Sequence, residues 1–138
     1  MIKNNKKLVF SLNKKGEGES NPILLRINLF PEYTKIDFGY ITTDKYNNGG
    51  WIKIASDTFI ENVETKERYT MTNAVGITIA PDLRNFESKK DWQYFSLYFP
   101  PMKQKDVTLN IIEVINGDAN DFNYHDIALK MQDGIEIF

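Results

Sequence analysis

Short runs in which apolar and polar side chains alternate recur along this chain, separated by Gly, Asn, Asp and Pro. Residues 35–40 and 95–99 show the alternation most clearly. A period of two places successive side chains on opposite faces of a β-strand. No stretch of ten or more residues in the sequence carries the apolar stripe of an amphipathic helix. The sequence therefore predicts an all-β fold, an antiparallel two-sheet β-sandwich of roughly eight to ten strands.

Length and composition agree with one such domain. A chain of 138 residues buries enough surface to form a core, and 41% of its residues are hydrophobic. It holds 16 Ile but only 5 Ala, which favours strands over helices. We expect a single β-sandwich domain over residues 1–138, with residues 1–7 as a loose N-terminal segment.

The turn residues and prolines suggest how the strands are connected. The Asn- and Gly-rich residues 46–50 are expected to form a hairpin turn between strands at 33–42 and 51–55. The polar loop at 81–91 is expected to contain one helical turn, near 83–86.

Apolar spacing also predicts which side chains share a face. In the strand that follows Pro22, one face is expected to carry Ile23, Leu25, Ile27 and Leu29. The apolar residues of 107–115 change phase near Ile111 and Ile112. Either a β-bulge or burial on both faces of the strand explains that change.

Charge and cysteine content exclude several classes of protein. The net charge is −2, with lysines and acids spread along the chain. A nucleic-acid partner is therefore not expected, because a groove that follows phosphates needs clustered Lys and Arg. The absence of cysteine excludes disulfides, thiolate zinc sites and a cysteine nucleophile.

The apolar run Leu8-Val9-Phe10 is too short for a signal-peptide core or a membrane span. We expect no membrane insertion. The sequence leaves the compartment open: we expect the cytoplasm for the chain as written, and the cell envelope or the exterior if a leader has been removed.

No catalytic motif stands out. His125 is the single histidine, too few for a multi-histidine metal site, and it is expected to be a surface or packing residue. Asp37, Asp57, Glu61 and Glu113 offer carboxylates, but nothing in the sequence distinguishes one pair of them. We expect no cofactor, and a small hydrolase with an unfamiliar site is the weakest alternative.

The turn at 116–123 contains several side-chain oxygens that suit a hard cation such as calcium. The weak candidate ligands are Asp118, Asn120, Asp121 and Asn123. Their spacing departs from the EF-hand pattern, and Asn, Asp and Gly also suit an ordinary tight turn. We expect no metal here, with calcium as an alternative.

The aromatic residues of the strand at 92–99 are the most suggestive feature. If Phe95, Leu97 and Phe99 face the core, Trp92, Tyr94 and Tyr98 share the opposite face. An exposed row of this kind would contact sugar rings or another protein. The alternative is that loops or a second layer cover the row. Trp51 is expected in the core instead.

A resemblance adds to this interpretation. The segments that carry it are GGWIKI, DTFI, ERYTM, AVGITIAPD, YFSLYFPPM, and NIIEVINGD followed by DFN. Over residues 23–129 they resemble a group of small, poorly characterised bacterial immunoglobulin-like domains. The resemblance implies an immunoglobulin-like β-sandwich of a kind often found in exported or cell-envelope proteins. It implies no catalytic residues.

Together these observations predict a non-enzymatic β-sandwich that acts as a protein-interaction or structural module. It would recognise a protein or glycan through the Trp92/Tyr94/Tyr98 face, or add a strand at a sheet edge. The alternative is a carbohydrate-binding or calcium-dependent accessory module.

Overall fold

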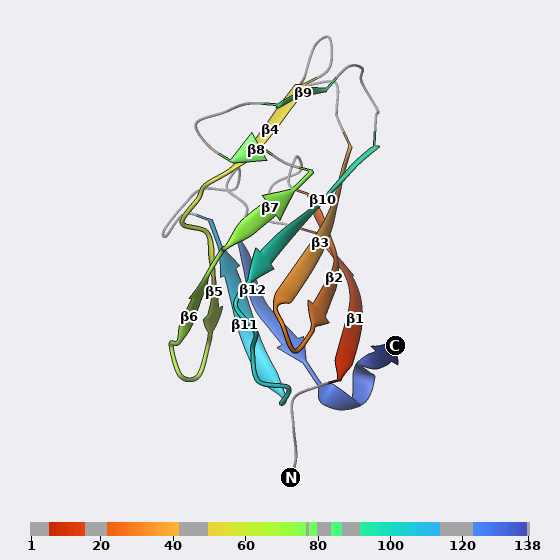
Figure 1. The fold of residues 1–138 in the computed structure, drawn as a ribbon, viewed down its shortest axis with the longest axis vertical. Helices are drawn as coiled ribbons and strands as arrows, with labels where there is room; N and C mark the ends of the chain where they lie inside the picture. Colours follow the sequence, from red (N-terminus) through yellow and green to blue (C-terminus); the bar gives the residue numbers. More distant parts are fainter. Residues whose placement is uncertain are drawn as a thin grey trace.

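A computed structural model describes residues 6–15, 22–41, 50–76, 78–79, 84–86, 92–113 and 123–137. Two antiparallel sheets stack face to face, which confirms the predicted β-sandwich (Figure 1). The six-stranded sheet has the order β13 (Ile135–Ile137), β1 (Lys7–Lys14), β2 (Ile23–Leu29), β3 (Thr34–Ile41), β10 (Trp92–Phe99) and β7 (Asn73–Val75). The four-stranded sheet has the order β12 (Tyr124–Leu129), β11 (Val107–Ile112), β5 (Phe59–Asn62) and β6 (Arg68–Thr70).

Three further strands form a separate small sheet with the order β8 (Thr78–Ile79), β4 (Gly50–Ile54) and β9 (Arg84–Phe86). In it, β4 pairs antiparallel with β9 and parallel with β8. Two sequence predictions are therefore wrong. The strand at 51–55 does not form a hairpin with β3, because β2 and β10 occupy both edges of β3. Residues 84–86 extend as a strand instead of forming a helical turn.

The first and last strands, β1 and β13, pair at one edge of the six-stranded sheet. Lys7, predicted to be loose, already lies in β1, while residues 1–5 are outside the described part of the chain. β13 pairs with β1 through three residues and follows a short 3-10 helix at Met131–Asp133. Among the described residues, no helix is long and apolar enough to span a membrane.

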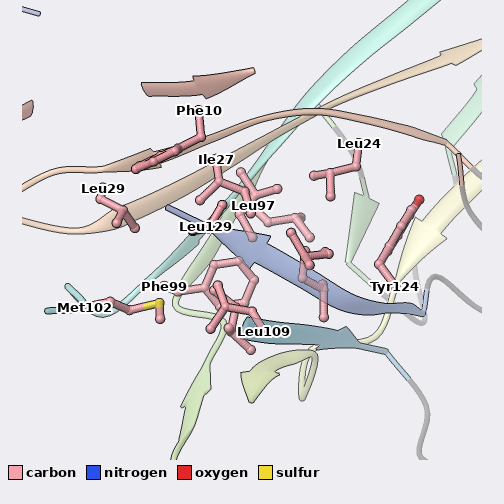
Figure 2. Packing of buried hydrophobic residues seen from close by; sticks show 14 of the residues in the cluster. Phe10, Leu24, Ile27, Leu29, Leu97, Phe99, Met102, Leu109, Tyr124 and Leu129 are labelled. Atoms are coloured by element: carbon pink, nitrogen blue, oxygen red, sulfur yellow. The ribbon is translucent and has the colours of Figure 1, made fainter. Parts of the chain in front are cut away.

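One hydrophobic core lies between the sheets. Leu24, Ile27 and Leu97 approach it from the six-stranded sheet, and Leu109 and Leu129 approach it from the other (Figure 2). These side chains are almost completely buried, and burial of apolar surface is the main driving force for such a stack.

The structure corrects the predicted face of β2. Its register with β3 shifts between Leu24 and Arg26, as expected for a β-bulge. Leu24, Ile27 and Leu29 are buried, whereas Ile23 and Leu25 are only half-buried. Because of the bulge, the core-facing position before Ile27 is Leu24, where simple alternation would place Leu25.

Burial on both faces of β11, and not a bulge in β11 itself, explains its phase change, because the register with β5 is unbroken. Ile111 and Ile112 are both buried, although their side chains point to opposite faces. The register with β12 shifts, but the extra residue lies in β12, where Asp126 has a φ of +56°. The Asn110 side-chain oxygen accepts a hydrogen bond from the Asp126 N–H at 2.9 Å and supports this bulge.

Tyr124 connects the two sheets. Its hydroxyl donates a hydrogen bond of 2.6 Å to the carbonyl oxygen of Pro22, immediately before β2. Burial of the ring, and secondarily the nearby Glu113 carboxylate, raise the pKa of Tyr124 far above its usual value. The hydroxyl therefore stays protonated and remains a donor at all physiological pH values.

We expect Tyr124→Phe to lower the free energy of unfolding by about 1–2 kcal/mol, because the buried Pro22 carbonyl loses its donor. Urea denaturation measures the change. Tyr94→Phe is the control, since Tyr94 is exposed and its hydroxyl should contribute less than about 0.5 kcal/mol. Equal losses in the two variants would contradict a structural role for the Tyr124 hydroxyl.

Candidate functional site

The large hydrophobic side chains that remain exposed lie on one face of the molecule. Among the described residues they are Val75, Tyr94, Ile135 and Ile137, which are 40–66% exposed. Phe95 and Leu97 point into the core, so the alternate residues of β10, Tyr94 and Ser96, point outward. Val75 lies opposite Ser96 in the register of β7 and β10 and therefore points outward as well. Ile135 and Ile137 pair with outward positions of β1. We call this side of the six-stranded sheet the outer face.

The exterior of the four-stranded sheet differs. There Glu61 and Arg68 form an ion pair with a distance of 3.1 Å between Oε2 and Nε. Phe59 and Ile112 also point to this side, but both are buried. The Arg68 guanidinium lies 4.4 Å from the centre of the Phe59 ring and covers it. The described large apolar side chains of this exterior are therefore covered, whereas the outer face leaves such side chains exposed.

The predicted aromatic row is only partly exposed. Tyr94 is 66% exposed on the outer face. Tyr98 is half-buried and packs edge-on against Tyr33, with 5.1 Å between ring centres. The side chains of Trp92 and Trp51 lie outside the described residues, so the row's third member and the expected core position of Trp51 remain predictions.

A polar cluster separates Tyr94 from Tyr98. Its centre is Asp37 on β3, which is 7% exposed. Ser96 Oγ donates a hydrogen bond to Asp37 Oδ1 at 2.6 Å, and Asn28 Nδ2 donates one to Oδ2 at 2.9 Å. Arg26 Nε lies 3.2 Å from Oδ2, and Lys35 Nζ lies 3.6 Å from Oδ1. Strands β2, β3 and β10 thus each contribute to one network, which we call the Asp37 cluster.

Opposing effects act on the charge of Asp37. Burial raises the pKa of Asp37, but the hydrogen bonds from Ser96 and Asn28 and the charges of Lys35 and Arg26 together lower it below the usual value. Asp37 is therefore ionised at neutral pH. The carboxylate neutralises part of the positive charge and holds Arg26 and Lys35 in place.

A shallow hollow of about 240 Å³ lies on the outer face between the Asp37 cluster and Tyr94. Leu25, Arg26 and Lys35 line one side of it, and Val75, Gly76 and Tyr94 line the other. Gly76 has a φ of +86°, and a Cβ atom there would lie only 2.6 Å from the Tyr94 carbonyl oxygen. A glycine at this position lets the end of β7 approach β10 closely.

Of the four sequence-predicted metal ligands, the structure describes one, Asn123. Asp118, Asn120 and Asp121 lie outside the described residues. Asn123 is buried, and its Oδ1 accepts a hydrogen bond of 2.8 Å from the Glu113 backbone N–H. In the part of the chain that the structure describes, no three His, Asp or Glu side chains form a metal-binding group.

His125 is also remote from the Asp37 cluster. It is exposed on β12 in the four-stranded sheet, and its backbone carbonyl accepts a hydrogen bond of 2.9 Å from Lys14 Nζ. The structure therefore does not bring His125 and Asp37 together as an acid–base pair.

Sequence reasoning missed the Asp37 cluster, although a signal was present. Arg26, Asn28, Lys35 and Asp37 alternate with apolar residues on two successive strands. All four occupy outward positions, and the register of β2 and β3 places Arg26 directly opposite Asp37. Ser96 could not be assigned to the cluster in this way, because its position opposite Asp37 depends on the pairing of β10 with β3.

This arrangement can recognise a ligand by contact. It combines an exposed aromatic ring, a shallow apolar wall and positively charged side chains fixed by a buried carboxylate. Comparison of the chain with protein-family models, with curated proteins and with solved structures finds no match.

Proposed function

We propose that this protein is a non-enzymatic binding module that recognises a protein partner through the outer face of its six-stranded sheet. The observation that carries the proposal is the exposure of Val75 and Tyr94 on neighbouring strands of this face, with Ile135 and Ile137 exposed on the same face at the opposite edge of the sheet. Val75 and Tyr94 adjoin the charged side chains of Arg26 and Lys35, and exposed apolar side chains bordered by polar groups are typical of interaction surfaces.

Tyr94 is the central residue of the proposed surface. A tyrosine offers a large, rigid contact area with a polar tip, and tyrosines often dominate binding energies. The Asp37 cluster beside it gives the surface a fixed pattern of charge. The mixed charges of the chain support a protein partner over nucleic acid, and edge strands β13 and β7 offer strand addition as an additional contact.

The proposal treats the sandwich as one of the immunoglobulin-like domains that its sequence resembles. Such a scaffold would hold the binding residues on rigid strands. Rigid placement lowers the entropy lost on binding, because these side chains and strands are already ordered before the partner arrives.

Site-specific photo-crosslinking in cells of the source organism tests the partner and its position together. A photoreactive benzophenone amino acid replaces Tyr94, and in a control protein it replaces Ala128, which is exposed on β12 of the other sheet. We expect a discrete protein adduct from position 94 and none from 128. Adducts from both positions, or from neither, would contradict the proposed surface.

A glycan is the second candidate ligand, favoured by the exposed Tyr94 ring next to the hydrogen-bonding groups of Arg26 and Lys35. Aromatic rings stack against the apolar faces of sugars while polar groups bind the hydroxyls. A glycan array tests this function with the wild type, Tyr94→Ala and Trp92→Ala. Sugar binding that survives both substitutions would exclude this face as the glycan site.

A further inference from the structure

We infer that the hollow beside Tyr94 binds a carboxylate on the partner, carried by an acidic residue that has an apolar neighbour in an extended peptide. This inference rests on the proposed function and specifies the chemistry of the partner.

The first step is the balance of charge in the hollow. Among the described residues, Arg26 and Lys35 are two cations that share one carboxylate, that of Asp37. Asp37 is buried beneath them, whereas 53% of the Arg26 side chain and 31% of the Lys35 side chain are exposed. The surface that a ligand meets is therefore positive.

The second step is the hydrogen-bonding capacity of Arg26. Its contact with Asp37 uses Nε. A guanidinium group carries five N–H donors in a planar fork, which suits a second carboxylate as a bidentate acceptor. Since Asp37 fixes one side of the fork, a bound carboxylate would meet a guanidinium that is already oriented.

The third step is the apolar side of the same hollow. Tyr94 and Val75 are exposed, and the half-buried Leu25 lies beside Arg26. A volume of about 240 Å³ is below the range of drug-sized ligand pockets, so it suits one side chain better than a free cofactor. An apolar neighbour of the bound acid would then contact the Tyr94 ring.

The opposite sheet provides a matched reference. Arg68 pairs with Glu61 at 3.1 Å and 51% of its side chain is exposed, which closely matches Arg26. There one cation meets one anion, and the guanidinium lies over the Phe59 ring. Arg68 therefore lacks the positive excess and the apolar wall that accompany Arg26.

Titration of the whole protein with short peptides, followed by NMR of the backbone amides, tests the inference. The probe is an acetylated and amidated pentapeptide in which leucines flank one glutamate, and its control has glutamine instead. We expect the glutamate peptide to shift the amide signals of Lys35 and Ser96 and to bind at least tenfold more tightly. A third peptide, with glutamine and a free C-terminal carboxyl, shows whether a terminal carboxylate serves as well.

Substitutions in the protein test whether the peptide binds at the hollow beside Tyr94. Arg26→Gln should weaken binding of the glutamate peptide about tenfold, whereas Arg68→Gln should leave it unchanged. Lys35→Gln is the second variant, with a smaller expected loss. Equal affinity for the glutamate and glutamine peptides in the wild type would overturn the inference without depending on any variant. If the Tyr94 adduct forms in cells while the peptides show no carboxylate preference, this inference fails and the proposed function stands; if neither is seen, both fail.

Discussion

Replacing Phe38 by alanine should lower the free energy of unfolding by about 3–5 kcal/mol, the usual cost of truncating a buried phenylalanine. Phe38 is 1% exposed at the centre of β3. Its ring stacks on Phe95 with 4.9 Å between centres and lies 5.6 Å from the ring of Tyr124 on the opposite sheet. The substitution removes one layer of an aromatic stack that joins the two sheets.

Urea denaturation followed by tryptophan fluorescence measures this loss. Tyr94→Ala is the control, because it removes an aromatic ring from the exposed side of the neighbouring strand. We expect the control to change stability by less than about 1 kcal/mol. If both variants lost the same stability, the assignment of inner and outer faces in β3 and β10 would be wrong.

The alternation that identified β3 and β10 was sufficient to predict their faces. Phe95, Leu97 and Phe99 are buried and Tyr94 is exposed, as their parity requires. Prediction of the inner face failed in β2, because Leu24 and Leu25 are chemically equivalent. Only the pairing with β3 shows that a bulge places Leu24 in the core.

The partners of each strand were harder to predict than its faces. Residues 46–50 have the composition of a hairpin turn, yet β4 pairs with β8 and β9. Local turn chemistry cannot show that β10, distant in sequence, occupies the remaining edge of β3. The same long-range pairing brings Ser96 to Asp37, so the Asp37 cluster could not be assembled from the sequence alone.

Replacing Asp37 by asparagine should lower the free energy of unfolding by about 2 kcal/mol at neutral pH. Asparagine offers one uncharged oxygen, so only one of the donors from Ser96 and Asn28 keeps an acceptor, and the other faces the amide NH2 group. Arg26 and Lys35 lose their counter-ion, although water can solvate both because they are partly exposed. Urea denaturation at several pH values measures the loss.

The loss should depend on pH in a defined direction. Because the folded-state pKa of Asp37 is lower than its unfolded value of about 3.9, the unfolded chain takes up the proton first as the pH falls. The stability that ionised Asp37 contributes is thus fully present above about pH 5 and is lost as the pH falls through the folded-state pKa. The difference between wild type and Asp37→Asn should therefore be constant near neutrality and shrink in acid.

Glu61→Gln provides the matched control, since Glu61 also pairs with an arginine across neighbouring strands. That pair lacks counterparts of Ser96 and Asn28, so we expect its removal to change stability by less than about 1 kcal/mol. If Asp37→Asn cost no more than Glu61→Gln, the Asp37 cluster would be an ordinary surface ion pair. Arg26 would then be free to move, and the hollow would lose the prepositioned guanidinium on which carboxylate recognition depends.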